Sequence, residues 1–134
     1  MYTREQLQEI LNKTFTDIFS DSYPVELYQP LDYIINIGGK RIRPLLTLMA
    51  CNVFSDQIDA AIQPAIGLEL FHNFTLIHDD IMDQADLRRN NKTIHKKWNE
   101  NVAILSGDAL MIKSYDFFID IDTGYQKKIL SVFN

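Results

Sequence analysis

The chain has 134 residues, the length of one domain, and its 46% hydrophobic and 23% charged residues are typical of a globular protein rather than a disordered one. A formal net charge of −5 disfavours general nucleic-acid binding, so an anion site would need a local concentration of cations or metal. The single Cys51 excludes an internal disulfide. The N-terminus lacks the apolar core of a signal peptide, and no apolar run is long enough to cross a membrane. Together these features predict a cytoplasmic protein without a membrane span.

The N-terminal part of the chain predicts two amphipathic helices. After a capping box formed by Thr3 and Gln6, apolar residues recur at helical spacing and indicate a helix over about 4–19. A turn over 20–24 leads to a second helix, whose apolar positions are Leu27, Leu31, Ile34 and Ile35. Because Pro30 fits this helix only in its first turn or at a kink, the sequence leaves the start of the helix open.

The segment GGKRIRP (38–44) follows the second helix. Its two glycines end that helix and let the backbone approach a ligand closely. Lys40, Arg41 and Arg43 place three cations beside the exposed amides of a new helix, which has Pro44 in its first turn. The segment therefore predicts either a phosphate-binding loop or a basic turn that faces solvent, and by itself it does not decide between them.

Four further helices are predicted in the rest of the chain. Apolar spacing places them at about 45–54, 58–82, 102–119 and from 123 onward. Pro64 marks either a kink in the fourth helix or its true start. A polar loop over 84–99 contains a single turn around His95 to Trp98. No stretch alternates with a period of two, so we expect no strands and a single all-α domain over 1–134 with about six helices.

The fourth predicted helix ends in an acidic cluster. Asp79, Asp80 and Asp83 form a DDxxD sequence, in which Asp79 and Asp83 lie four residues apart and therefore on one helical face. Two carboxylates at this spacing suit a Mg²⁺ ion that keeps several waters and completes its shell with phosphate oxygens. At about 100° per residue, His72 and Thr75 lie on the same face. The other sides of the helix are apolar, so we expect the polar face to line a cavity.

Two arginines, Arg88 and Arg89, follow the acids, and their planar guanidinium groups match phosphate geometry. DDxxD alone is a weak pattern, because an acidic helix end followed by basic residues can simply be solvated. The acids, both arginines and the cationic segment 38–44 together favour a metal and diphosphate site. His72 fits either a phosphate contact or a hydrogen-bonded core residue.

These motifs, in this order and spacing, closely resemble the trans-isoprenyl diphosphate synthases of the polyprenyl synthetase family over essentially the whole chain. The matching stretches are GGKRIRP (38–44), LELFHNFTLIHDDIMD (68–83), LRR (87–89), TIH (93–95) and SGDAL (106–110). The resemblance implies the N-terminal half of the antiparallel helical bundle of isoprenoid synthases, with a central cavity. It also implies a homodimer, and a prenyl transfer that joins an allylic diphosphate to isopentenyl diphosphate.

The resemblance assigns roles to the candidate residues. Asp79 and Asp83 would bind Mg²⁺, the implied cofactor, with Asp80 supporting the cluster and Arg88 holding the allylic diphosphate. The diphosphate of isopentenyl diphosphate would be held by Lys40, Arg43, His72 and Arg89. The metal would stabilise the departing diphosphate so that the allylic bond ionises, and apolar walls would keep water from the resulting cation.

Product length in this family depends on the bulk of the side chains below the first acidic cluster. Phe74 stands five residues before Asp79, with the smaller Thr75 after it and Phe71 further back. By resemblance, an aromatic residue at Phe74 implies a short product, farnesyl to geranylgeranyl. The helical wheel, however, places Thr75 rather than Phe74 directly below Asp79.

The chain departs from the family pattern in two places. Asn90 and Lys92 stand where the family usually has glycine and proline, which puts the path of that loop in question. The family also carries a second aspartate-rich motif, and Asp116, Asp120 and Asp122 do not form one. We therefore expect an N-terminal fragment of a longer enzyme, inactive by itself and with uncovered apolar faces.

Two other functions remain open at this point. One is a non-catalytic helical interaction or regulatory module derived from the same family, which the missing second motif supports. The other is a cyclase or a head-to-head synthase. The segment GGKRIRP disfavours that reading, because a cyclase has no isopentenyl diphosphate to hold.

Overall fold

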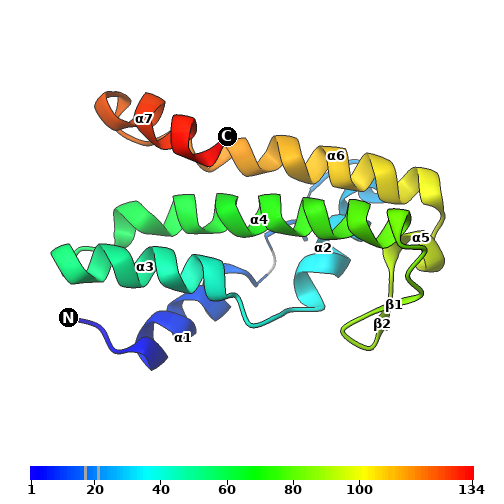
Figure 1. The fold of residues 1–134 in the computed structure, drawn as a ribbon, viewed down its shortest axis with the longest axis horizontal. Helices are drawn as coiled ribbons and strands as arrows, with labels where there is room; N and C mark the ends of the chain where they lie inside the picture. The colour runs from blue at the N-terminus through cyan, green and yellow to red at the C-terminus, as the bar shows by residue number, and fades with distance from the viewer. Residues whose placement is uncertain (17, 21) are drawn as a thin grey trace.

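The computed structural model describes residues 1–16, 18–20 and 22–134, with the side chain of Thr123 left aside. Within these residues the chain forms seven helices and one short hairpin (Figure 1). The elements are α1 (Arg4–Thr14), α2 (Val25–Asn36), α3 (Ile42–Phe54), α4 (Asp59–Met82), β1 (Leu87–Arg88), β2 (Asn91–Lys92), α5 (Ile94–Lys97), α6 (Glu100–Asp116) and α7 (Thr123–Phe133). The all-α prediction is confirmed apart from the hairpin, and none of the described helices could cross a bilayer.

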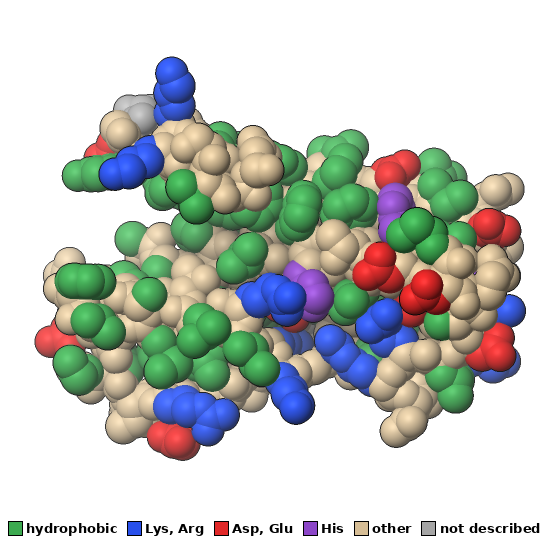
Figure 2. Space-filling view, in the orientation of Figure 1, with side chains coloured by type: hydrophobic (Ala, Val, Ile, Leu, Met, Phe, Trp, Pro, Cys, Tyr) green, Lys and Arg blue, Asp and Glu red, His purple; other side chains and the backbone are tan. Residues whose placement is uncertain are grey.

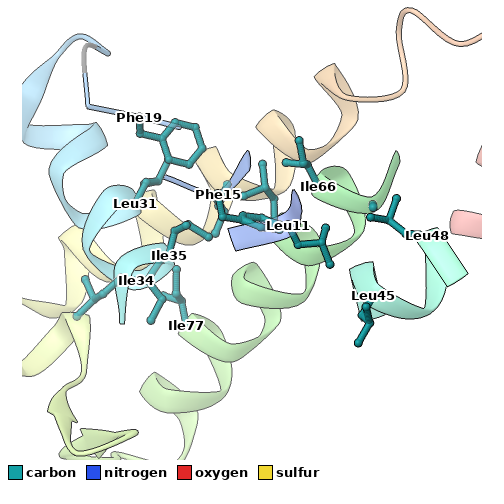
Figure 3. Packing of buried hydrophobic residues seen from close by; sticks show 14 of the residues in the cluster. Leu11, Phe15, Phe19, Leu31, Ile34, Ile35, Leu45, Leu48, Ile66 and Ile77 are labelled. Carbon is teal, nitrogen blue, oxygen red and sulfur yellow. The ribbon is translucent and has the colours of Figure 1, made fainter. Parts of the chain in front are cut away.

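Helix α4 is the centre of the fold. It packs against α6 on one side and α3 on the other, while α2 packs on α6 and α1 on α3. The colours of Figure 1 show that α3, α4 and α6 run in alternating directions. Buried aliphatic and aromatic residues join these helices into one core (Figure 3). Fully buried members include Leu11, Leu31, Leu48, Leu70 and Leu110. The core therefore fixes α4 from Ala65 to Ile81 and presents its C-terminal end at one edge.

The first helix is shorter than the sequence predicts. It ends at Thr14 rather than near residue 19, and Phe15 is its C-cap. Phe15 and Phe19 are nevertheless buried in the core. The spacing of apolar residues in this segment therefore indicates which side chains are buried, but not that the backbone is helical throughout. Asp17 and Asp21, which the predicted helix and turn include, lie outside the described residues.

The prediction of no strands is wrong, because β1 and β2 pair in an antiparallel hairpin. Each strand has two residues, too few to show an alternating pattern in the sequence. Arg89 and Asn90 form the turn, with positive φ angles of 52° and 63°, as tight hairpin turns require. Asparagine adopts this left-handed conformation more readily than most residues, so Asn90 can stand where the family usually has glycine.

Pro30 and Pro64 both lie inside helices. Pro30 lies within α2 beyond the first turn, and Pro64 lies within α4, which begins at Asp59. Each proline lacks an N–H and so removes one backbone hydrogen bond from its helix. Pro64 is therefore not the start of α4, which continues to the acidic cluster as predicted.

Candidate active site

The acidic cluster lies at the C-terminal end of α4. Asp79 is in the last turn, and Asp83 is the C-cap, whose N–H donates to the Asp79 carbonyl oxygen over 2.8 Å. Both side chains are exposed and one helical turn apart, at a helix end that attracts cations. Figure 2 shows acidic and basic side chains gathered over this end of α4.

These two carboxylates fit a Mg²⁺ ion. They are hard oxygen donors with open space on the solvent side, which leaves room for waters and phosphate oxygens. Among the described residues, no three His, Cys, Asp or Glu side chains converge on one point. An ion held by Asp79 and Asp83 could complete its coordination with water and phosphate oxygens.

Asp80 is turned into the protein instead. It is 4% exposed and accepts two hydrogen bonds from Arg88 of β1, from Nε to Oδ2 and from Nη2 to Oδ1, each over 2.8 Å. The hydrogen bonds from Arg88 to Asp80 raise the pKa of the Arg88 guanidinium. A planar guanidinium and a carboxylate match each other in this two-bond geometry. Asp80 therefore orients Arg88, and the guanidinium keeps one edge free for an anion.

His72 on α4 contacts the first turn of α3. Arg43 lies in that turn and donates from Nη1 to Nε2 of His72 over 3.2 Å. Because a guanidinium has no acceptor, this contact places the proton of a neutral imidazole on Nδ1. Burial lowers the pKa of His72, and the nearby guanidinium groups, chiefly that of Arg43, lower it further. The lowered pKa favours the neutral imidazole, which can offer its Nδ1–H as a donor.

The hairpin and the segment 38–44 meet at Gly39. A Cβ atom at Gly39 would lie 2.5 Å from Nη1 of Arg89, so the Arg89 guanidinium rests on a surface that only glycine leaves free. Lys40 is exposed next to this contact. The cations of two segments that are far apart in sequence are thus brought together beside α4.

Hydrogen bonds from two side chains hold the hairpin in place. The hydroxyl of Tyr33 on α2 donates to the carbonyl oxygen of Lys92 over 2.8 Å. The hydroxyl of Thr93, which is fully buried, donates to the carbonyl oxygen of Ala85 over 2.7 Å. These bonds fix both ends of the hairpin and therefore the two arginines that it carries.

Aromatic rings lie below the acids, on the side of α4 toward its N-terminus. Phe71 and Phe74 make an edge-to-face contact at 5.2 Å between ring centroids, and Phe133 of α7 contacts Phe71 at 4.9 Å. We call these three rings the aromatic barrier. Thr75 contributes little bulk, because its hydroxyl turns back and donates to the His72 carbonyl oxygen over 2.7 Å.

Two buried polar residues of α4 were missed from the sequence. Glu69 is 5% exposed and Asn73 is 3% exposed, and Asn73 Nδ2 donates to the Glu69 carbonyl oxygen over 2.8 Å. On a helical wheel they share a stripe with Asp80, rotated by about 80° from the exposed acids. The available signal was a glutamate between two leucines, Leu68 and Leu70, in an apolar run.

The chain is similar in sequence to known proteins. The chain is 41% identical over 99 residues to the geranylgeranyl diphosphate synthase of Methanosarcina mazei, across 74% of this chain and 31% of that protein. It is 36% identical over 108 residues to the geranylgeranyl pyrophosphate synthase of Geoglobus acetivorans, across 81% of this chain and 34% of that protein. The chain thus spans about a third of the length of these curated relatives.

Solved structures show the same similarity. One crystal structure of a geranylgeranyl pyrophosphate synthase matches with a TM-score of 0.93 and 44% identity, over 99% of this chain and 41% of that chain. Another, geranyltransferase from Helicobacter pylori complexed with magnesium and isoprenyl diphosphate, matches with a TM-score of 0.82 and 28% identity, over 98% of this chain and 47% of that chain. The family model described as Polyprenyl synthetase matches residues 24–134. Because that match covers most of the chain, the chain belongs to the polyprenyl synthetase family.

Proposed function

We propose that the protein is a trans-isoprenyl diphosphate synthase that condenses an allylic diphosphate with isopentenyl diphosphate. The observation that carries this proposal is the meeting of two cationic segments, 38–44 and the hairpin, beside two exposed carboxylates at one end of α4. Such a site offers separate contacts for two diphosphates. A cytoplasmic location stays a prediction from composition.

The exposed acids and Arg88 would hold the allylic substrate. Asp79 and Asp83 would bind Mg²⁺ together with oxygens of the allylic diphosphate, and Arg88, oriented by Asp80, would bind the same diphosphate. Bound Mg²⁺ supplies Lewis-acid stabilisation of the negative charge on the departing diphosphate. Arg88 adds a fixed positive charge at the same oxygens, which favours breaking of the allylic C–O bond.

The other cations would hold isopentenyl diphosphate. The residues that would bind its diphosphate are Lys40, Arg43, His72 and Arg89. With the two diphosphates side by side, the double bond of isopentenyl diphosphate can capture the allylic cation, and loss of a proton completes one elongation. The aromatic barrier and the apolar core below it would exclude water that would otherwise consume the cation.

Product analysis tests this function directly. The complete natural protein is incubated with labelled isopentenyl diphosphate, Mg²⁺ and allylic primers of increasing length. We expect a chain-elongated product that requires both the primer and the metal, and absence of product with every primer would reject the function. The 134-residue chain alone is expected to be inactive, because Asp116 pairs with Lys113 and Asp122 caps α7 rather than joining a second cluster. Prenyl transfer by this chain alone would contradict that expectation.

A second candidate function is a non-catalytic helical interaction or regulatory module. It is favoured by exposed apolar residues on α6, where Leu105 and Ile112 are 61% and 62% exposed and lie seven residues apart on one face. The same face would serve a homodimer of the enzyme. A second aspartate cluster further along the natural reading frame would favour the enzyme, and its absence would favour the module.

Charge on this α6 face is expected to break a homodimer. In the complete natural protein, Leu105→Glu with Ile112→Glu should convert a dimer into a monomer, because two unpaired carboxylates would have to be buried in the interface. Light scattering after size-exclusion chromatography measures the mass. Phe54→Glu, at a residue that is 90% exposed at the end of α3, is the matched control and should leave the dimer intact. If the double variant remained a dimer, the dimer interface would not lie on this face of α6.

The aromatic barrier is expected to limit product length to farnesyl or geranylgeranyl. Phe74→Ala removes the ring closest to the acids and should lengthen the product, because the growing chain could then pass between Phe71 and the neighbouring helices. Chromatography of the hydrolysed products measures the length. Phe54→Ala removes an exposed ring elsewhere and should change nothing. An unchanged product from Phe74→Ala in a folded enzyme would remove Phe74 from this role.

A further inference from the structure

One face of α4 meets α6 through rings and a glycine. Its members recur every three or four residues and therefore share a helical face: Gly67, Phe71, Phe74 and His78. α6 runs beside α4 in the opposite direction (Figure 1). At one end of this face, a Cβ atom at Gly67 would lie 2.8 Å from the carbonyl oxygen of Ser114 in α6. His78 stands at the other end, next to the acidic cluster, and the proposed reaction gives it no role.

His78 rests on the backbone of α6 at Gly107. A Cβ atom at Gly107 would lie 2.5 Å from Cδ2 of His78 and closer still to Nε2, so only glycine leaves room for the ring in this position. Nε2 also faces two acceptors of α6, the carbonyl oxygen of Ile104 at 3.5 Å and Oδ1 of Asp108 at 3.6 Å. Both polar contacts are long. Packing against Gly107, more than hydrogen bonding, therefore fixes the ring.

The ring of His78 also touches Phe74. The two rings make an edge-to-face contact with 4.9 Å between centroids and 74° between planes, a favourable geometry for aromatic pairs. Phe74 contacts Phe71 in a similar way, so a row of rings runs along α4 from the acidic end into the aromatic barrier. The position of the Phe74 ring thus depends on His78, whose own position depends on the missing side chain at Gly107.

We propose that His78 is a positioning residue for the aromatic barrier: resting on Gly107, its ring holds the ring of Phe74 in place and so helps to set the length of the product. This inference rests on the proposed function, because it names what supports the part of the site that limits chain growth. His78 itself binds neither diphosphate nor metal. Without its ring, Phe74 gains the freedom to turn aside, and a longer prenyl chain can pass.

A purely structural role of His78 predicts a different result. If His78 only joins α4 to α6, His78→Ala lowers stability and leaves product length unchanged. If it holds Phe74, the variant also raises the ratio of longer to shorter products, by roughly two- to tenfold, the worth of one aromatic contact. Asp108→Asn separates packing from charge, because it removes the carboxylate that faces Nε2 but leaves Gly107 in place. We expect its product to match that of the wild type.

The first experiment compares the products that the complete natural protein and its variants form from labelled isopentenyl diphosphate and an allylic primer. His78→Ala and Gly107→Ala should both lengthen the product, since a methyl group at 107 displaces the ring. The double variant should go no further, because the methyl group then meets no ring. Gly124→Ala in α7 is the matched control and should change nothing, since its Cβ would meet only Oδ1 of Asp122, at 3.3 Å. An unchanged product from folded His78→Ala, a still longer one from the double variant, or a longer one from Asp108→Asn would each overturn the inference.

Urea unfolding of the same variants separates this inference from the proposed function, because it needs no activity. Alanine favours a helix more than glycine does, so Gly107→Ala should raise the urea midpoint in the His78→Ala background. With His78 present, the same change should lower the midpoint, because the ring must move. Phe74→Leu and His78→Ala together should lower it by less than the sum of their separate effects, since they remove one shared contact.

The outcomes of the two experiments are distinct. An effect of Gly107→Ala with the same sign in both backgrounds, or additive effects of Phe74→Leu and His78→Ala, would overturn the inference even in an active enzyme. If both couplings are found but the wild type forms no prenyl product with any primer, the proposed function fails, whereas the placement of Phe74 by His78 stands.

Discussion

Replacing Asp79 by asparagine is expected to lower kcat/KM for the allylic diphosphate by about 10³-fold, equivalent to about 4 kcal/mol of transition-state stabilisation. The amide keeps the shape of the side chain but loses the charge that would hold Mg²⁺ at the exposed end of α4. The loss in kcat/KM should become smaller as the Mg²⁺ concentration rises, because a metal site of lower affinity can still be filled by mass action. The measurement is kcat/KM across a Mg²⁺ titration of the complete natural protein, and Asp83→Asn should behave in the same way.

Asp86→Asn is the matched control for Asp79→Asn. Asp86 would continue the acidic face if α4 extended that far, but the helix ends at Met82 and Asp86 pairs with Lys96 over 3.0 Å. Both aspartates are exposed, so the same chemical change is made at two sites of similar accessibility. We expect less than a threefold effect, roughly what loss of one surface ion pair gives. Equal effects at Asp79 and Asp86 would show that the acids act through overall charge rather than by binding a metal.

The helices could be predicted from the sequence where one apolar face is long and continuous. The periodicity of α3 and α4 gave their ends to within a few residues, because both helices pack against neighbouring helices. The same reasoning overextended α1, where Phe15 and Phe19 reach the core from a turn. It also missed the hairpin, which depends on two residues with positive φ that periodicity cannot reveal.

The candidate site shows a similar division. The spacing of Asp79 and Asp83 was sufficient to place both on one exposed face. The wheel could not show that Asp80 and Glu69 face inward, because their burial depends on where α3 and the hairpin pack. Nor could it show that Arg88 pairs with Asp80, since that contact is made by a loop whose path the sequence left open. Contacts within one helix follow from sequence, whereas contacts between segments need the fold.

Asp80→Asn is expected to destabilise the protein by about 3 kcal/mol, because it removes the negative charge that a largely buried carboxylate gives to Arg88 and replaces one of its two acceptor oxygens with an amide donor. The Asp80 side chain is 5% exposed and that of Arg88 is 24% exposed, so water replaces the lost bonds only in part. Urea unfolding of the complete natural protein measures the change. kcat/KM for the allylic substrate should fall as well, since Arg88 is no longer oriented.

The Mg²⁺ dependence distinguishes this role from that of a metal ligand. Because Asp80 faces Arg88 rather than solvent, Asp80→Asn should leave the Mg²⁺ concentration for half-maximal rate unchanged, whereas Asp79→Asn should raise it. Combining Asp80→Asn with Arg88→Met should recover part of the lost stability, since the unpaired and partly buried charge is then removed. A raised Mg²⁺ requirement in Asp80→Asn, or no recovery in the double variant, would mean that Asp80 acts on the metal and that its pairing with Arg88 is incidental.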